Sequence, residues 1–371
     1  MAKVMHPRDG MSYVINDVLM PAVQSTFSDL AAMIDEFDIV VSHPLTYVVP
    51  LICHQRGRPW VSLVLSPISM LSAFDPPVLA PAPFLARLRG LGPVFNRRLF
   101  AMLRGMSTSW TKPLHQLRMS LGVDPYGDPL WEGQHSPHRV LAMFSSEFAR
   151  PQPDWPHQTV QCGFPDEPAP TPEMGGELIE FLQAGEAPLV FTLGSSAVVA
   201  DGDFYRLAIS VCKDLGCRAV FVAGGHARKL LNPNTRLFHL VAWTSYHELF
   251  PHARLVVHAG GIGTAAACLR AARPQLVIPF SHDQFDNAQR LQNMGVALVL
   301  RRSKVSVQSL RHTIEQAMRT PALQDKAVES SRRHAGRNGA VIAAQEIIQT
   351  AVSFAPNESQ KQKEVSNALA D

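Results

Sequence analysis

The stretch Leu255-Val-Val-His-Ala-Gly-Gly-Ile-Gly-Thr264 joins a short apolar run to a glycine-rich turn, and a helical pattern follows at Thr264–Ala272. An apolar run of this length predicts a buried strand of a parallel sheet. Glycines after such a strand let the backbone approach a ligand, and the N–H groups at the start of the next helix favour a phosphate. A tight strand-to-helix turn without a ligand is the alternative, because short glycine-rich motifs are common.

The same alternation extends to both sides of this stretch. Apolar runs predict further strands at Leu189–Leu193, Ala219–Ala223, Leu237–Val241, Leu276–Pro279 and Ala297–Leu300. Helical patterns fall at Phe204–Leu215, at Gln284–Met294 and from Val307 to about Phe354. Strands that alternate with helices in this way predict an α/β fold with an open, doubly wound parallel sheet.

The first half of the chain has a similar but less regular pattern. It predicts helices at Asp17–Glu36, Leu45–Gln55, Phe84–Arg104 and Ser107–Leu121, and strands at Asp38–Ser42, Trp60–Leu65, Val140–Ser145 and Thr159–Gly163. The segment Pro165–Gly176 is rich in proline, glycine and acidic residues, which is typical of a linker. We therefore predict a Rossmann-like lobe at 1–164, a linker at 165–176, a second Rossmann-like lobe at 177–354 and a polar tail at 355–371.

Composition narrows the functional classes. The chain has 371 residues, is 46% hydrophobic and carries a net charge of +3, so it can bury a core and is unsuited to charge-driven binding of nucleic acid. Its 5 cysteines form no C-x-x-C pair, which argues against a zinc or redox motif and favours a reducing compartment. No stretch predicts a signal peptide or a membrane span. We expect a cytoplasmic protein with at most peripheral membrane contact.

Three more strand ends in the second half carry residues suited to a ligand. Ser195 follows the strand at Leu189–Leu193 and can face a phosphate; Trp243 follows Leu237–Val241 and can stack on a flat base. Asp283 and Gln284 follow Leu276–Pro279 and can bind vicinal hydroxyls. The alternatives are a simple turn, core packing of the tryptophan, and helix capping by Ser281 or Asp283. Together, features for phosphate, base and hydroxyls at the ends of strands of one sheet predict a nucleotide-sugar pocket.

These residues resemble the donor-binding signature of the nucleotide-sugar-dependent glycosyltransferases with the two-lobed GT-B fold, the UDP-glycosyltransferase superfamily. The family pattern is a Trp, then His-x-Gly-Gly-x-Gly-Thr, then Pro-x-x-x-Asp-Gln-x-x-Asn. The matching residues here are Trp243, His258, Gly260, Gly261, Gly263, Thr264, Pro279, Asp283, Gln284 and Asn287. A weaker likeness at Trp60–Leu79 and Gln152–Phe164 is to the bacterial branch with the rhamnolipid rhamnosyltransferases.

The resemblance implies two lobes that face a cleft, and an inverting transfer from a UDP- or dTDP-sugar to a hydroxyl of a small, largely apolar or lipid-like acceptor, as in secondary metabolism. It implies no metal and no cofactor other than the sugar donor. Trp243 would stack on the uracil or thymine ring. His258 would contact the diphosphate, together with the glycines, Thr264 and Ser195, while Asp283 and Gln284 would hold the sugar hydroxyls.

The start of the sequence departs from the family. Members begin with a strand and a glycine-rich loop that carries the catalytic base, whereas this sequence enters the lobe at what would be a later helix, so we expect an incomplete N-terminal lobe. His43, after a predicted strand, is a candidate base, and Asp75 is a second; a loop histidine that lines an acceptor pocket or caps the next helix is the alternative. The arginines of Phe84–Arg104 suit either a lipid contact or a solvated helix face. The alternative function is a nucleotide-sugar-binding protein with weak or no catalysis, and a two-lobed epimerase or hydrolase is a third.

Overall fold

Short apolar runs, most of them fully buried, form the sheet of the C-terminal lobe. Its strands are β5 (Leu189–Thr192), β6 (Ala219–Val222), β7 (Phe238–Val241), β8 (Leu255–His258), β9 (Gln275–Val277) and β10 (Ala297–Val299). They pair in parallel in the order β10-β9-β8-β5-β6-β7, so the direction of winding reverses between β5 and β8. This is the strand order of a Rossmann fold, and it confirms the predicted doubly wound sheet. The computed structural model describes residues 3–123, 127–166, 174–194, 202–224 and 235–355.

Helices cover both faces of this sheet because alternate strand residues point to opposite sides. On one face, Leu189 and Phe191 pack with α8 (Gly202–Leu215) and α13 (Val307–Met318). On the other, Val190 packs with α6 (Gly176–Gln183) and with Cys268 of α11 (Ile262–Arg270). The lobe also contains α10 (Tyr246–Leu249), η7 (Phe250–His252), α12 (Gln284–Asn293), η8 (Arg302–Lys304) and α14 (Pro321–His334).

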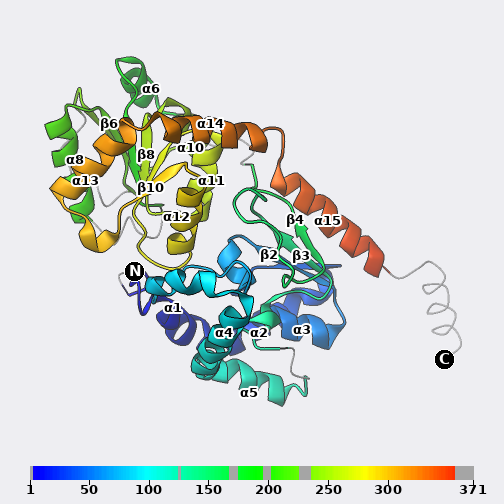
Figure 1. Cartoon of the computed structure of the whole chain (residues 1–371). Helices are drawn as coiled ribbons and strands as arrows, with labels where there is room; N and C mark the ends of the chain where they lie inside the picture. Colours follow the sequence, from blue (N-terminus) through cyan, green and yellow to red (C-terminus); the bar gives the residue numbers. More distant parts are fainter. Residues whose placement is uncertain (1–2, 124–126, 167–173, 195–201, 225–234, 356–371) are drawn as a thin grey trace, which may run out of the picture.

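The N-terminal lobe has a smaller parallel sheet. Its strands are β1 (Val40–Ser42), β2 (Trp60–Val64), β3 (Arg139–Ala142) and β4 (Thr159–Gln161), which pair in that order. All four lie where the apolar runs predicted them, and the sheet has two strands fewer than the described C-terminal sheet (Figure 1).

The helices of this lobe are more broken than the sequence pattern predicted. They are α1 (Gly10–Tyr13), η1 (Val14–Leu19), α2 (Val23–Met33), η2 (Ile34–Glu36), α3 (Val49–Arg56), η3 (Pro67–Met70), η4 (Pro83–Leu91), α4 (Pro93–Ser107), η5 (Thr108–Thr111), α5 (Lys112–Ser120) and η6 (Glu132–Gln134). The single helix predicted at Phe84–Arg104 is split because Gly92 has a φ of 89° and Pro93 begins a new helix.

The last of the described helices, α15 (Gly339–Phe354), returns to the N-terminal lobe, where Figure 1 shows it beside β3 and β4. Its Ala343 packs with Val61 and Leu141, and Glu346 lies 3.2 Å from Arg139. The predicted domain boundary at 354 assigned this helix to the C-terminal lobe, and in that respect the structure differs. The chain crosses back at Gly339, whose N–H donates to the carbonyl of Phe164 at 3.0 Å.

The two lobes share an apolar cluster. Val64, Val140 and Phe144 of the N-terminal lobe belong to the same buried group as Ala265, Leu269 and Leu291 of the C-terminal lobe. Residues at the carboxyl ends of β2 and β3 therefore pack against α11 and α12 across the boundary between the lobes. Among the described residues, none of the helices has the length and apolar character needed to span a bilayer.

Candidate functional site

A cavity of about 840 Å³ lies at the carboxyl ends of β5, β6, β7 and β8, where the winding of the C-terminal sheet reverses. Its walls come from the segments after these strands, which include Thr192–Gly194, Trp243–Tyr246 and Gly261–Thr264. The N-terminal lobe contributes Leu65, Met143 and Phe164. A cavity of this size at a topological switch point is the usual place for a small-molecule ligand in an open α/β sheet.

The glycine-rich turn forms one wall of the cavity and begins α11. Gly261 is the N-cap of α11 and lines the cavity together with Gly263, and a Cβ atom at either position would meet nothing within 4 Å. Gly260 has a φ of +88°, and a Cβ atom there would lie 2.8 Å from Val277 Cγ1. The turn therefore needs glycine at 260 for its conformation and leaves room for a ligand over 261 and 263.

Trp243 is available for stacking, since 57% of its surface is exposed and it lines the cavity. This excludes the alternative that the tryptophan is a core residue. Next to it, Thr244 and Ser245 also line the cavity, and their buried hydroxyl oxygens have no hydrogen-bond partner within the described part of the chain. Buried polar groups are nearly always paired, so these two hydroxyls are candidates for contact with a polar ligand. Neither hydroxyl is among the site residues predicted from the sequence.

His258 has a different role from the predicted contact with diphosphate. The ring is buried, with Nδ1 accepting from the N–H of Gly260 at 3.1 Å and Nε2 lying 2.9 Å from Gln275 Oε1. These partners assign the proton to Nε2. Burial lowers the pKa of His258 to about 4, so the ring is neutral at pH 7. Both ring nitrogens are thus occupied in holding the glycine-rich turn, and neither faces the cavity.

Gln284 closes the turn before α12. Its Oε1 accepts from the N–H groups of Phe280 at 2.9 Å and Ser281 at 3.1 Å, and the residue lines the cavity. Asp283 is the N-cap residue of α12, but its side chain makes no capping hydrogen bond. The capping alternative is therefore not the function of this carboxylate.

Asp283 and Asn287 are joined to the glycine-rich turn by hydrogen bonds. Asn287 Nδ2 donates to Asp283 Oδ2 at 2.8 Å and to the carbonyl of Gly260 at 3.0 Å. Burial is the main cause that raises the pKa of Asp283. The predicted donor-side residues are thus brought together: Trp243, Gly261, Gly263, Thr264 and Gln284 on the cavity wall, and His258, Gly260, Asp283 and Asn287 in the layer that supports it. Ser195 lies outside the described residues.

The two candidate bases do not reach the cavity wall. His43 lines a separate hollow of about 10 Å³, and its Nδ1 accepts from the N–H of Leu45 at 3.2 Å. This agrees with the alternative that His43 caps the following turn. Asp75 is paired with Arg290 at 2.7 Å. Among the described residues that line the cavity there is no His, Asp or Glu.

The chain is similar to known proteins that are described as glycosyltransferases. Residues 223–353 match the family described as erythromycin biosynthesis protein CIII-like, C-terminal domain. The chain is 29% identical over 299 residues to O-mycaminosyltylonolide 6-deoxyallosyltransferase of Streptomyces fradiae, an alignment that covers 78% of this chain and 67% of the relative. Other curated relatives are matched over less than half of their own length.

Solved structures show the same fold. The kitacinnamycin glycosyltransferase superposes with a TM-score of 0.67 at 18% identity, covering 90% of this chain and 82% of that one. The glycosyltransferase VinC, solved in complex with dTDP, superposes with a TM-score of 0.62 at 20% identity, covering 91% of this chain and 80% of that one. The solved structures confirm the predicted GT-B fold, and the family model and the curated relative agree with the predicted resemblance to glycosyltransferases.

Proposed function

We propose that this GT-B chain is a glycosyltransferase that binds a UDP- or dTDP-sugar and transfers the sugar, with inversion, to a hydroxyl of a small, largely apolar acceptor. One observation carries the proposal. One cavity at the switch point of the C-terminal sheet is walled by an exposed tryptophan, a glycine-rich helix start, an amide side chain and two hydroxyls that have no partner among the described residues.

Each wall suits one part of the donor. Trp243 stacks on the base, and the hydroxyls of Thr244 and Ser245 donate to its carbonyl oxygens. The diphosphate lies over the glycines at the start of α11, where backbone N–H groups and the helix dipole stabilise the leaving group without a metal ion. Gln284 uses its Oε1 in the turn, which leaves its Nε2 group to donate to a sugar hydroxyl.

The wall from the N-terminal lobe indicates the class of acceptor. Leu65, Met143 and Phe164 present apolar side chains, and they line the same cavity as the residues proposed to bind the donor. An apolar wall binds the body of a hydrophobic acceptor and keeps water away from the reacting carbon.

The second candidate function is nucleotide-sugar binding with weak or no transfer. It is favoured by the lack of a His, Asp or Glu among the described residues of the cavity wall, because an acceptor hydroxyl needs a base within hydrogen-bond reach. Loss of such a base costs a factor of about 10²–10⁴ in rate.

Calorimetric titration with UDP, dTDP and ADP, followed by a turnover assay on a panel of apolar acceptors, separates these functions. Binding of UDP or dTDP with transfer supports the glycosyltransferase. Binding without transfer supports the second candidate, and no preference for the pyrimidine diphosphates over ADP refutes both.

A further inference from the structure

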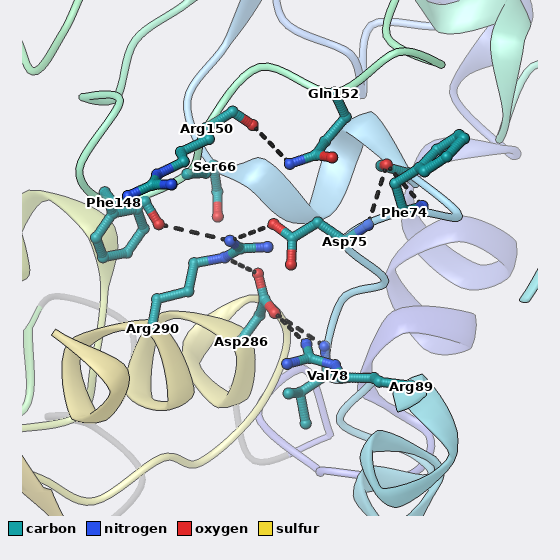
Figure 2. A network of polar contacts seen from close by, with 12 residues as sticks. Ser66, Phe74, Asp75, Val78, Arg89, Phe148, Arg150, Gln152, Asp286 and Arg290 are labelled. Atoms are coloured by element: carbon teal, nitrogen blue, oxygen red, sulfur yellow. Dashed lines mark hydrogen bonds and ion pairs between the residues drawn. The ribbon is translucent and has the colours of Figure 1, made fainter. Parts of the chain in front are cut away.

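Helix α12 carries a buried ion network that joins the two lobes (Figure 2). Its centre is Asp286, whose side chain has no exposed surface. Asp286 Oδ1 accepts from the N–H of Val78 at 2.9 Å and from Arg89 Nη2 at 3.1 Å, and both donors belong to the N-terminal lobe. Asp286 Oδ2 accepts from Arg290 Nε at 2.7 Å, one turn further along α12.

Arg290 extends the network to a second carboxylate. Its Nη1 donates to Asp75 Oδ2 at 2.7 Å and lies 3.5 Å from the carbonyl oxygen of Phe148. Figure 2 shows the guanidinium of Arg290 between Asp75 and Asp286. The two carboxylates and two guanidinium groups balance in charge, so removing one member leaves an uncompensated charge in a buried place.

The position of the network gives it a role beyond holding the lobes together. Buried ion pairs of this kind add little stability over apolar packing, whereas they do fix one arrangement of the groups that they join. Asp286 and Arg290 lie on the helix that starts with Gln284 and is preceded by Asp283. Asn287 of the same helix accepts from Ser66 Oγ of the N-terminal lobe at 3.1 Å.

We propose that Asp286 and Arg290 are positioning residues, which orient Gln284 toward the sugar of the donor, with Asp283 supporting it from behind, by fixing α12 against the N-terminal lobe. This inference rests on the proposed function and deepens it, because it makes recognition of the sugar depend on the docking of the lobes. The base is bound by the segment after β7, outside the network, and the glycine-rich turn after β8 is held by His258 and Gln275 as well as by Asn287. Disturbing the network therefore weakens sugar recognition and transfer while leaving nucleotide binding intact.

The test compares three variants of the full chain. Asp286→Asn removes the central charge, and Arg89→Met is a milder change because the Arg89 side chain is partly exposed. Glu132→Gln is the matched control, since it removes a 2.7 Å ion pair with Arg104 inside the N-terminal lobe. For each protein, the affinities for UDP and dTDP are measured beside those for UDP-glucose and dTDP-glucose, together with turnover. Hydrogen exchange is followed at the amides of 283–287 and 261–265.

We expect Asp286→Asn to bind UDP within about twofold of the wild-type affinity. The variant should lose the additional affinity that glucose contributes to UDP-glucose binding. Its turnover should fall about 100-fold, because misplacing a substrate-binding group by about 1 Å has an effect of that size. In Asp286→Asn, hydrogen exchange should rise at 283–287 and stay unchanged at 261–265. Arg89→Met should change exchange in the same direction, and Glu132→Gln should exchange like the wild type. Two results would overturn the proposal: an equal loss of affinity for UDP and for UDP-glucose, or unchanged hydrogen exchange at 283–287 in both Asp286→Asn and Arg89→Met. Failure of the wild type to bind either nucleotide refutes the proposed function instead, and hydrogen exchange then still decides the positioning role.

Discussion

The neutral, buried ring of His258 makes the free energy of unfolding depend on pH, and this contribution can be measured separately from that of other titrating groups. The unfolded chain takes up a proton on this ring with a pKa of 6.5, whereas in the folded state burial lowers that pKa to about 4. Between these values the unfolded state binds more protons, so the stabilisation is complete above pH 6.5 and is lost as the pH falls through 4. From the two pKa values, the loss between pH 7 and pH 5 is about 2 kcal/mol.

The assay is urea unfolding of the wild type and of His258→Asn at pH 7 and pH 5. Asparagine has no titratable ring, and its side-chain oxygen can still accept from the N–H of Gly260. Other groups titrate as well, among them His135, whose pKa burial also lowers to about 4, but they are the same in both proteins and cancel in the comparison. The wild type should lose about 2 kcal/mol more than the variant between the two pH values.

A matched control is His312→Asn, at an exposed position of α13, which should behave as the wild type. If the wild type and His258→Asn lose the same free energy of unfolding on acidification, then the ring of His258 is not held neutral by the fold. The interpretation of this residue as the support of the glycine-rich turn would then be wrong.

Three further changes test other parts of the structure. Trp243→Ala should weaken UDP binding by about 10- to 100-fold in calorimetry, because stacking on the ring contributes about 1–3 kcal/mol. The melting temperature should change little, since the ring is exposed. An unchanged affinity would show that the nucleobase does not stack on Trp243. Gly339→Ala should destabilise the chain by more than about 1 kcal/mol in urea unfolding, since its Cβ would collide with the carbonyl of Gly163, whereas Gly176→Ala, with open space around it, should not. Leu65→Gln should raise the KM for an apolar acceptor by about tenfold without affecting UDP affinity, and a parallel loss of both would place the acceptor elsewhere.

Much of the fold could be predicted because its signals are local. Runs such as Leu189–Thr192 and Leu255–His258 are apolar at every position but the last, as strands buried on both faces must be. The helix breaks were also visible in principle, since Gly92 and Pro93 lie within the stretch that was read as one helix. Helical periodicity of the apolar residues continues across this break, and for that reason the pattern alone missed it.

That these residues lie around one cavity could be predicted from the sequence, but the contacts of their side chains could not. The sequence pattern of a histidine at the end of a buried strand is the same whether its ring contacts a phosphate or the backbone of the following turn. The difference is made by Gln275, a buried amide on the neighbouring strand, which engages Nε2. In the same way, nothing near Asp286 in sequence indicates a buried ion pair across the lobes, because Val78 and Arg89 come from a distant part of the chain.

The charges around the cavity lead to a conclusion about how a diphosphate can be held. Of the described residues that line it, Arg270 alone has a cationic side chain, and it is paired with Asp166 at 3.1 Å. His258 is neutral, and the arginines of the interlobe network are already matched by Asp75 and Asp286. Among the described residues, the positive potential available to the proposed diphosphate therefore comes mainly from the backbone at the start of α11. The side chains behind the turn are neutral or internally paired, which agrees with this arrangement. They fix the direction of the N–H groups of the turn and do not themselves attract the ligand.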